Sequence, residues 1–209
     1  MPDNFLAEIR LSKTGAYGII YRGDVLWVPL YEDIRDGNLT PDEVAETTEM
    51  LVRDLQRDRA MKSVEPLGRG RFRVYYEKTG QLGERSDVIF IRRNEQIITL
   101  SSYEDGRVEI KGRVLSASHR QQLLDAKVDF SGKFRVVTDA VALRGNALAT
   151  KPRGFGSYVV YDWILRSLRD KPPYLEVRLD RPTATPVQGT PTAPGPSGSS
   201  ASGSIPTPN

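Results

Sequence analysis

Hydrophobic and polar residues alternate at period two in several short segments, a pattern typical of strands with one buried face. In the segment FLAEIRLSK, the apolar residues Phe5, Ala7, Ile9 and Leu11 fall on one face and the charged residues on the other. We therefore predict a first strand here. Two further short strands are expected near residues 17–21 and 25–30, joined by a hairpin turn at Arg22-Gly23-Asp24, because Gly and Asp suit the backbone of tight turns.

The pattern changes to helical spacing after residue 40. Thr40 has the features of an N-cap, with Pro41 at the first helical position and Glu43 completing a capping box. Apolar residues then recur at Val44, Met50 or Leu51, and Leu55, which predicts a helix with a narrow apolar stripe that docks on a sheet.

Strand patterns dominate after Pro66, and tight polar turns separate them. A short helix is expected to interrupt them, capped by Ser118 with Gln121 as the partner in its capping box. The segment SYVVYDWILRSLRD fits either a helix capped by Ser157 or a strand, and YLEVRL predicts a last strand. The segments with strand patterns before this ambiguous one are RFRVYYEK, SDVIFIRRN, QIITLSS, GRVEIKGRV and SGKFRVVTDAVALRGNALA.

Together these elements predict an α+β fold: mainly antiparallel sheet(s) with two or three helices and a disordered C-terminal tail. We expect an N-terminal meander plus helix over 1–63, which could be a subdomain of one domain, and a strand-rich α+β domain over 64–181. Residues 182–209 contain no charged residue and consist almost entirely of Pro, Thr, Ser, Gly and Ala, so they are expected to be disordered. This tail is either a solubilising extension or a tether whose anchor is Ile205.

Composition narrows the classes of function. The 209 residues are 38% hydrophobic and 27% charged, which are values of a globular protein. The absence of cysteine excludes disulfides, zinc–thiolate sites and thiol nucleophiles. No apolar run approaches the roughly 20 residues that span a bilayer, and no signal peptide pattern is present, so we expect a soluble, cytoplasmic protein without membrane insertion.

Catalytic and metal-binding chemistry find little support. His119 is the only histidine, and its neighbour Ser118 is expected to act as a helix cap rather than as a nucleophile. Without cysteine and with one histidine, only an all-oxygen metal site could form, and no calcium-loop motif occurs. We therefore predict no catalytic residues, no metal and no cofactor, although a carboxylate pair brought together by folding stays open.

The segment GRGRFRVYYEKTG raises the question of nucleic-acid binding. It matches part of an RNA-recognition-motif consensus, but the positions of the stacking aromatic residues are occupied by arginine. As a strand it would turn Phe72, Val74 and Tyr76 inward, and Arg71 and Arg73 to solvent. A basic sheet face would require that Arg92, Arg93, Arg107, Lys111 and Arg113 join them, although glutamates are interspersed among these residues.

A second candidate is an anion site in the segment KPRGFGS. Lys151 and Arg153 precede two glycines and Ser157, so backbone N–H groups and two cations would converge if a helix began at Ser157. A connecting loop is the simpler interpretation, because glycine-rich loops usually serve geometry.

With a formal net charge of +3, acidic and basic residues are nearly balanced. The sequence therefore favours a non-enzymatic protein-binding or scaffold domain of bacterial type with a protein partner, and it leaves the oligomeric state open. The alternatives are a nucleic-acid-binding protein that uses an Arg-rich sheet face, and an enzyme of unknown chemistry.

Overall fold

The computed structural model describes residues 1–90, 97–128, 130–150 and 156–180. Within these residues there are three helices and twelve strands, and the strands form two mostly antiparallel sheets. This confirms the predicted α+β class. The tail from residue 182 lies outside them. The helices are α1 (Val28–Asp36), α2 (Pro41–Gln56) and α3 (Ala117–Asp125). The strands are β1 (Pro2–Leu11), β2 (Ala16–Leu26), β3 (Met61–Gly68), β4 (Arg71–Gln81), β5 (Ser86–Phe90), β6 (Ile98–Ser102), β7 (Arg107–Gly112), β8 (Gly132–Thr138), β9 (Val141–Gly145), β10 (Leu148–Thr150), β11 (Val159–Leu165) and β12 (Tyr174–Arg178).

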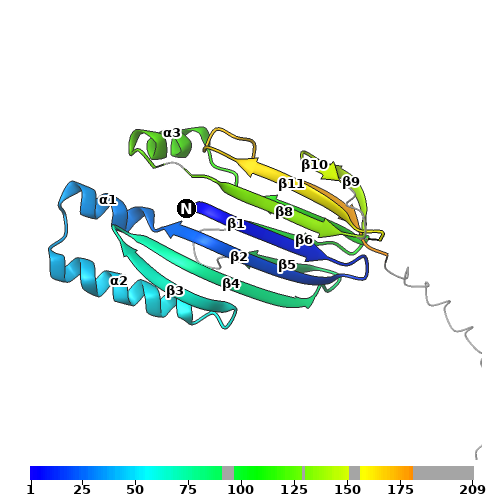
Figure 1. The fold of residues 1–209 in the computed structure, drawn as a ribbon, viewed down its shortest axis with the longest axis horizontal. Coiled ribbons are helices and arrows are strands. Elements are labelled where there is room, and N and C mark those ends of the chain that lie inside the picture. The colour runs from blue at the N-terminus through cyan, green and yellow to red at the C-terminus, as the bar shows by residue number, and fades with distance from the viewer. Residues whose placement is uncertain (91–96, 129, 151–155, 181–209) are drawn as a thin grey trace, which may run out of the picture.

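The seven-stranded sheet has the order β10-β11-β8-β1-β2-β4-β3, and the five-stranded sheet has the order β5-β6-β7-β12-β9 (Figure 1). β1 and β8 pair in parallel, although more than a hundred residues separate them in the chain, and the other described strand pairs are antiparallel. In the seven-stranded sheet, β1 and β2 from residues 1–63 thus lie between β8 and β4 from residues 64–181.

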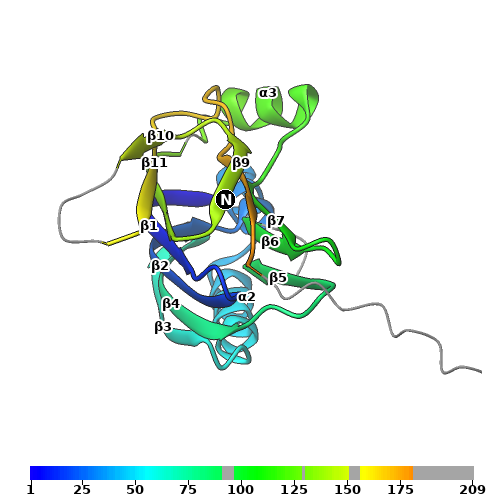
Figure 2. The same cartoon turned by 90° about the vertical axis from the view of Figure 1, so that its right-hand side faces the viewer.

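The two sheets pack face to face as a sandwich (Figure 2). Aromatic side chains join them at the centre: the ring of Phe90 on β5 lies 4.7 Å from that of Tyr21 on β2 and 4.5 Å from that of Tyr76 on β4. Each ring buries a large apolar area, so this cluster stabilises the contact between the sheets. One hydrophobic core runs through both sheets.

The strand faces follow the alternation in the sequence. In β1, Ala7, Ile9 and Leu11 are fully buried, and in β4 both Phe72 and Tyr76 are 1% exposed. The side chains between them point to the outer face of the seven-stranded sheet. The period-two pattern of these two strands is therefore confirmed, because each strand has one face in the core.

The predicted hairpin turn at Arg22-Gly23-Asp24 is wrong. These residues lie within β2, which pairs with β1 on one side and β4 on the other. Asn4 and Phe5 of β1 together oppose Gly23, which forms a β-bulge. Gly23 has a φ of 155°, and a Cβ atom there would lie 2.5 Å from the Cα of Phe5. The glycine therefore allows a close approach of two backbones.

The predicted strand over 25–30 is also wrong, because β2 ends at Leu26 and α1 begins at Val28. Pro29 lies in the first turn of α1, where its fixed φ and missing N–H are tolerated. The run of apolar residues here is too short for its period to distinguish strand from helix.

The helix predicted after Thr40 is confirmed. The Thr40 side chain accepts a hydrogen bond from the backbone N–H of Glu43, and the Glu43 carboxylate accepts one from the backbone N–H of Thr40 at 2.8 Å. Leu51 and Leu55 are buried in the core, whereas Met50 is 52% exposed. This resolves the alternative between Met50 and Leu51 in favour of Leu51.

The N-cap of α3 differs from the predicted one. The cap of α3 is Ser116, whose hydroxyl accepts a hydrogen bond from the backbone N–H of His119. Ser118, the predicted cap, lies inside the helix, so that prediction is wrong by two residues.

The ambiguous segment from residue 157 forms strand β11 (Val159–Leu165), because its Trp163 and Leu165 pack into the core between the sheets.

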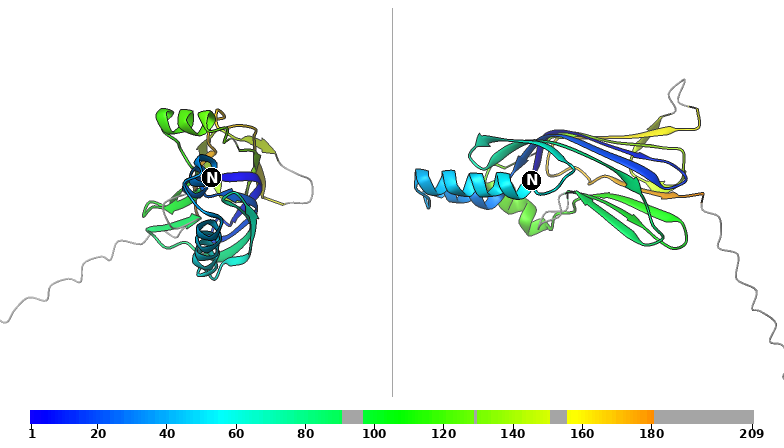
Figure 3. Two further views of the ribbon diagram at one scale, coloured as in Figure 1. Left: turned by 90° about the vertical axis from the view of Figure 1, so that its left-hand side faces the viewer. Right: turned by 90° about the horizontal axis from the view of Figure 1, so that it is seen from below.

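The helices gather at the end of the sandwich where β1 begins (Figure 3). α2 lies beside the edge strand β3, and α1 and α3 share a second apolar cluster that includes Leu26, Val28, Leu123 and Leu168. The outer face of the seven-stranded sheet is left without a described helix over it (Figure 1).

Candidate functional site

Arg71 and Arg73 lie side by side on β4, on the outer face of the seven-stranded sheet, and each forms an ion pair. Arg71 Nη1 donates a hydrogen bond to Asp3 Oδ2 at 2.5 Å, and Arg73 Nε donates one to Asp24 Oδ1 at 3.0 Å. The hydrogen bond from Arg73 is strengthened by the low exposure of Asp24, which is 9%. A carboxylate thus offsets each of these two positive charges.

The cations expected to join them on one basic face lie elsewhere. Arg107 and Lys111 are on β7 of the five-stranded sheet, where the buried Val108 and Ile110 turn them to the opposite outer surface of the sandwich. The structure therefore brings Arg71 and Arg73 together but separates them from β7. Four other candidates lie outside the described residues, as does the tail anchor Ile205: Arg92, Arg93, Lys151 and Arg153.

The anion hypothesis for KPRGFGS depended on a helix that begins at Ser157. The element that follows is strand β11, so no helix N–H groups converge at this position.

A cluster of carboxylates, hydroxyls and cations covers the outer face of the five-stranded sheet, and sequence reasoning did not find it. Glu109 on β7 and Glu176 on β12 are directly opposite each other across the strand pair. Glu176 Oε2 accepts hydrogen bonds from Arg144 Nε at 2.6 Å and from the Tyr174 hydroxyl at 2.8 Å. Glu109 Oε2 accepts one from the Tyr103 hydroxyl at 2.8 Å.

Cations and hydroxyls keep both glutamates charged. The hydrogen bond from the Tyr174 hydroxyl, followed by that from Arg144, lowers the pKa of Glu176 below its usual value. Burial alone would raise the pKa of Glu109, but its hydrogen bonds with Lys111 and Tyr103 outweigh this and lower it. A general acid needs a carboxyl group that holds its proton near neutral pH, so this pair is suited to joining strands and not to proton donation.

The signal for this cluster was the alternation of charged with apolar residues in GRVEIKG and YLEVR. It is readable only when the pairing is known, because Glu109 and Glu176 are 67 residues apart in the sequence. The register of β7 with β12 brings them together.

An apolar patch lies on the outer face of the seven-stranded sheet. Three large aliphatic side chains form it: Leu6 on β1, Leu148 on β10 and Ile164 on β11, with exposures of 48%, 72% and 62%. The registers place Ile164 and Leu6 in one row across the sheet with Lys133 of β8 between them, and Leu148 directly opposite Asp162. We call Leu6, Leu148 and Ile164 the apolar patch.

The row that contains Leu148 continues into charged residues, which pair with one another. Arg135 on β8 donates two hydrogen bonds to Asp162 on β11, at 2.7 and 3.1 Å. Beside them, Arg10 Nε donates a hydrogen bond to Glu8 Oε1 at 2.7 Å. Beyond this row a shallow hollow continues over Val137, Val160 and Gly18.

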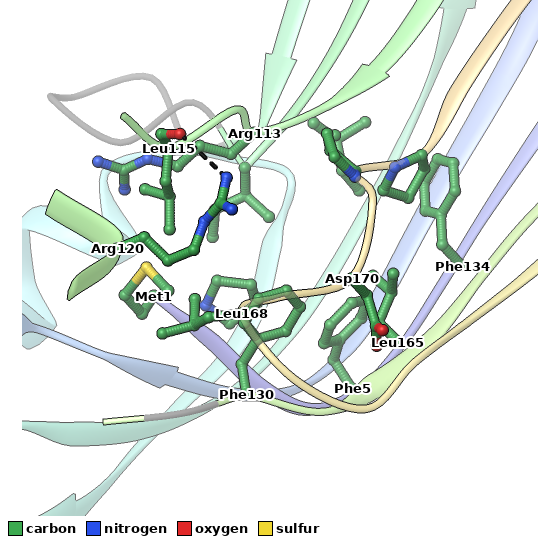
Figure 4. A pocket seen from close by; sticks show the side chains of 16 residues that line it. Met1, Phe5, Arg113, Leu115, Arg120, Phe130, Phe134, Leu165, Leu168 and Asp170 are labelled. Carbon is green, nitrogen blue, oxygen red and sulfur yellow. Dashed lines mark hydrogen bonds between the residues drawn. The ribbon is translucent and has the colours of Figure 1, made fainter. Parts of the chain in front are cut away.

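A small cavity lies between the sheets near α3 (Figure 4). Its walls are mostly apolar and come from both sheets, from the segments flanking α3 and from the segment after β11. Arg113, Arg120 and Asp170 are the charged residues among its described lining.

Comparison with models of known protein families finds no match for this chain, and no curated protein matches it significantly. In the described part of the chain, no group of three or more His, Asp or Glu side chains is arranged to hold a metal ion. Among the described helices, none combines the length and the apolar character required to cross a membrane.

Proposed function

We propose that this protein is a non-enzymatic binding domain that docks a protein partner on the apolar patch. The observation that carries the proposal is the exposure of Leu6, Leu148 and Ile164 on a sheet face that no described helix covers. Large aliphatic side chains that are gathered on one face and remain in water favour association with another surface. A sheet face presents them on a rigid support, so little conformational entropy is lost on binding.

The charges around the apolar patch define the chemistry of the partner. Lys133 lies between Leu6 and Ile164, is exposed, and forms no ion pair with any residue that the structure describes. The neighbouring Arg135 and Asp162 neutralise each other. The complementary surface is therefore a protein surface of apolar side chains around one acidic group, and the carboxylate of that group pairs with Lys133.

The two alternatives have less support. Nucleic-acid binding needs cations that are available to phosphates, whereas Arg71 and Arg73 each contact an aspartate. Acid–base catalysis by the carboxylate pair needs one protonated member, whereas the pKa values of Glu109 and Glu176 are both lowered.

A photo-crosslinking residue at position 164 tests the proposal in extracts of the source cells. We expect a discrete protein adduct at position 164 and none at position 49, an exposed site on α2 that serves as the matched control. Mass spectrometry then identifies the partner, and binding is measured with the two purified proteins. An adduct that nuclease removes would instead favour the nucleic-acid alternative.

Substitutions then test the chemistry of the contact. Ile164→Lys is expected to weaken binding at least about tenfold, because it places a charge in an apolar contact, and Glu49→Lys is expected to leave it unchanged. Lys133→Glu should weaken binding, and Lys133→Arg should preserve it. Unchanged affinity for Ile164→Lys, with the fold verified by circular dichroism, would refute docking on the apolar patch.

A further inference from the structure

The cavity near α3 has the features of an interior binding site. Apolar side chains from both sheets and from neighbouring segments surround it: Phe5, Ile98, Phe130, Phe134, Leu165 and Leu168. Its volume is about 50 Å³. Because one water-sized atom needs roughly 10–15 Å³ of such a space, the cavity accommodates about four non-hydrogen atoms. The mostly apolar part of its wall favours an aliphatic group over water, since a water molecule there would have few hydrogen-bond partners away from Arg120.

Arg120 of α3 provides a polar contact at the wall of this cavity. In Figure 4, Arg120, Met1 and Leu115 line one side, and Phe134 and Leu165 line the other. The Arg120 Nη2 atom donates one long hydrogen bond of 3.4 Å to the backbone oxygen of Leu115. The Nε atom is buried and has no hydrogen-bond acceptor among the described residues.

A buried guanidinium N–H without an acceptor is unfavourable, and an anion would satisfy it. Asp170 also lines the cavity, but its Oδ2 atom accepts hydrogen bonds from the backbone N–H groups of Arg166 and Ser167, at 2.6 and 3.1 Å. The carboxylate of Asp170 thus stabilises the turn that follows β11. No ion pair links Asp170 to Arg120 in the part of the chain that the structure describes. The Arg120 guanidinium is therefore available to an acceptor supplied by a ligand.

We propose that this cavity binds a short-chain aliphatic carboxylate. The aliphatic end, of about four carbon atoms, occupies the cavity between the sheets, and the carboxylate accepts hydrogen bonds from the Arg120 guanidinium. The cavity lies inside the sandwich and the apolar patch lies on its outer face, so the two sites share no residue.

A chain-length series tests the size of the site on the full-length protein. Isothermal titration calorimetry and thermal unfolding are measured with acetate, butyrate, pentanoate, hexanoate, octanoate and decanoate. We expect affinity to rise about fourfold for each added methylene group up to pentanoate or hexanoate, and to stop rising beyond that length. The melting temperature should rise in the same order. No binding by any member, or affinity that keeps rising to decanoate, would overturn the proposal of a short-chain site.

Variants test the role of Arg120. Arg120→Gln should weaken binding of pentanoate at least about tenfold and leave binding of the uncharged 1-pentanol unchanged, and Arg120→Lys should restore part of the affinity for pentanoate. Arg169→Gln is the matched control, because Arg169 is exposed near the cavity and does not line it. Equal pentanoate affinity in folded Arg120→Gln and in the parent protein would contradict the proposal.

A second variant tests the cavity without changing a charge. Leu165→Phe fills the space and should abolish binding of both pentanoate and 1-pentanol. Binding of either compound by this variant, with its cooperative unfolding retained, would place the ligand elsewhere and overturn the proposal.

Discussion

Single residues decide local geometry in this protein, and Gly23 is the clearest case. Its backbone lies against the bulge formed by Asn4 and Phe5, at a φ of 155° that side chains disfavour. Phe5 stacks on Tyr21 at a ring distance of 5.6 Å, so a shift of β1 would disturb the aromatic core as well.

Gly23→Ala is therefore expected to destabilise the protein by about 2–3 kcal/mol or more, through backbone strain and a forced separation of β1 from β2. Urea denaturation measures the change. Gly18→Ala is the matched control on the same strand, because a Cβ atom there would meet only Thr79 Cγ2 at 3.8 Å. Its effect should stay within about 0.5 kcal/mol. Similar losses for the two variants would argue against the bulge as the cause.

Glu176 makes stability depend on pH, since its pKa is lowered in the folded state. Its contribution is present above the unfolded pKa of about 4.3 and is lost as the pH falls through the lower folded value. Glu176→Gln should therefore lower the urea midpoint at pH 7, and the difference from the parent should shrink toward pH 3. Glu46→Gln, at an exposed site on α2, should differ from the parent at neither pH. A loss for Glu176→Gln that is the same at both pH values would contradict this explanation.

At the scale of elements, the helices differ in how clearly their sequences specify them. α2 has a complete capping box and sixteen residues, so its signals are local and its N-terminus was predictable. α1 has nine residues and no side-chain cap at Trp27. Its local signals are Pro29 in the first turn and Gly37 at the C-terminal end, and the packing of Val28 and Leu30 in the core stabilises the helix.

Thr40→Ala should cost about 1 kcal/mol of stability, because the N-terminal N–H groups of α2 lose an acceptor. Thermal or urea unfolding measures the loss. Thr47→Ala is the same chemical change in the middle of the helix, and it should be neutral or slightly stabilising, since alanine has the higher helix propensity. A loss at position 47 as large as at position 40 would show that capping is not responsible.

At the scale of the whole molecule, the seven-stranded sheet ties distant parts of the chain together. β4 pairs along eleven positions with β2, and β8 pairs in parallel with β1. A chain of residues 64–181 alone would expose the edges of both strands and one side of the core. These long-range pairings also predict slow folding, because loops must close before the contacts form.

We expect residues 64–181 alone to show no cooperative unfolding transition, whereas residues 1–180 should unfold cooperatively at nearly the melting temperature of the full chain. Circular dichroism during heating measures both. The second expectation rests on the composition of residues 182–209, which offers little apolar surface to bury. A cooperative transition in the fragment 64–181 would show that it folds as a separate domain.

The sequence by itself determined the elements whose signals are local: the alternating faces of β1 and β4, the capping box of α2 and the α+β class. Period-two alternation and capping are read from neighbouring residues, so they can be recognised without knowledge of the fold. The tertiary structure alone decided the role of Gly23, the aspartate partners of Arg71 and Arg73, and the meeting of Glu109 with Glu176. It also decided the apolar patch and the cavity at Arg120. The bulge at Gly23, the meeting of Glu109 with Glu176 and the apolar patch depend on strand register, and the cavity depends on how the segments around α3 pack against both sheets. Neither register nor packing can be read from neighbouring residues, because both are set by the assembly of the two sheets around one core.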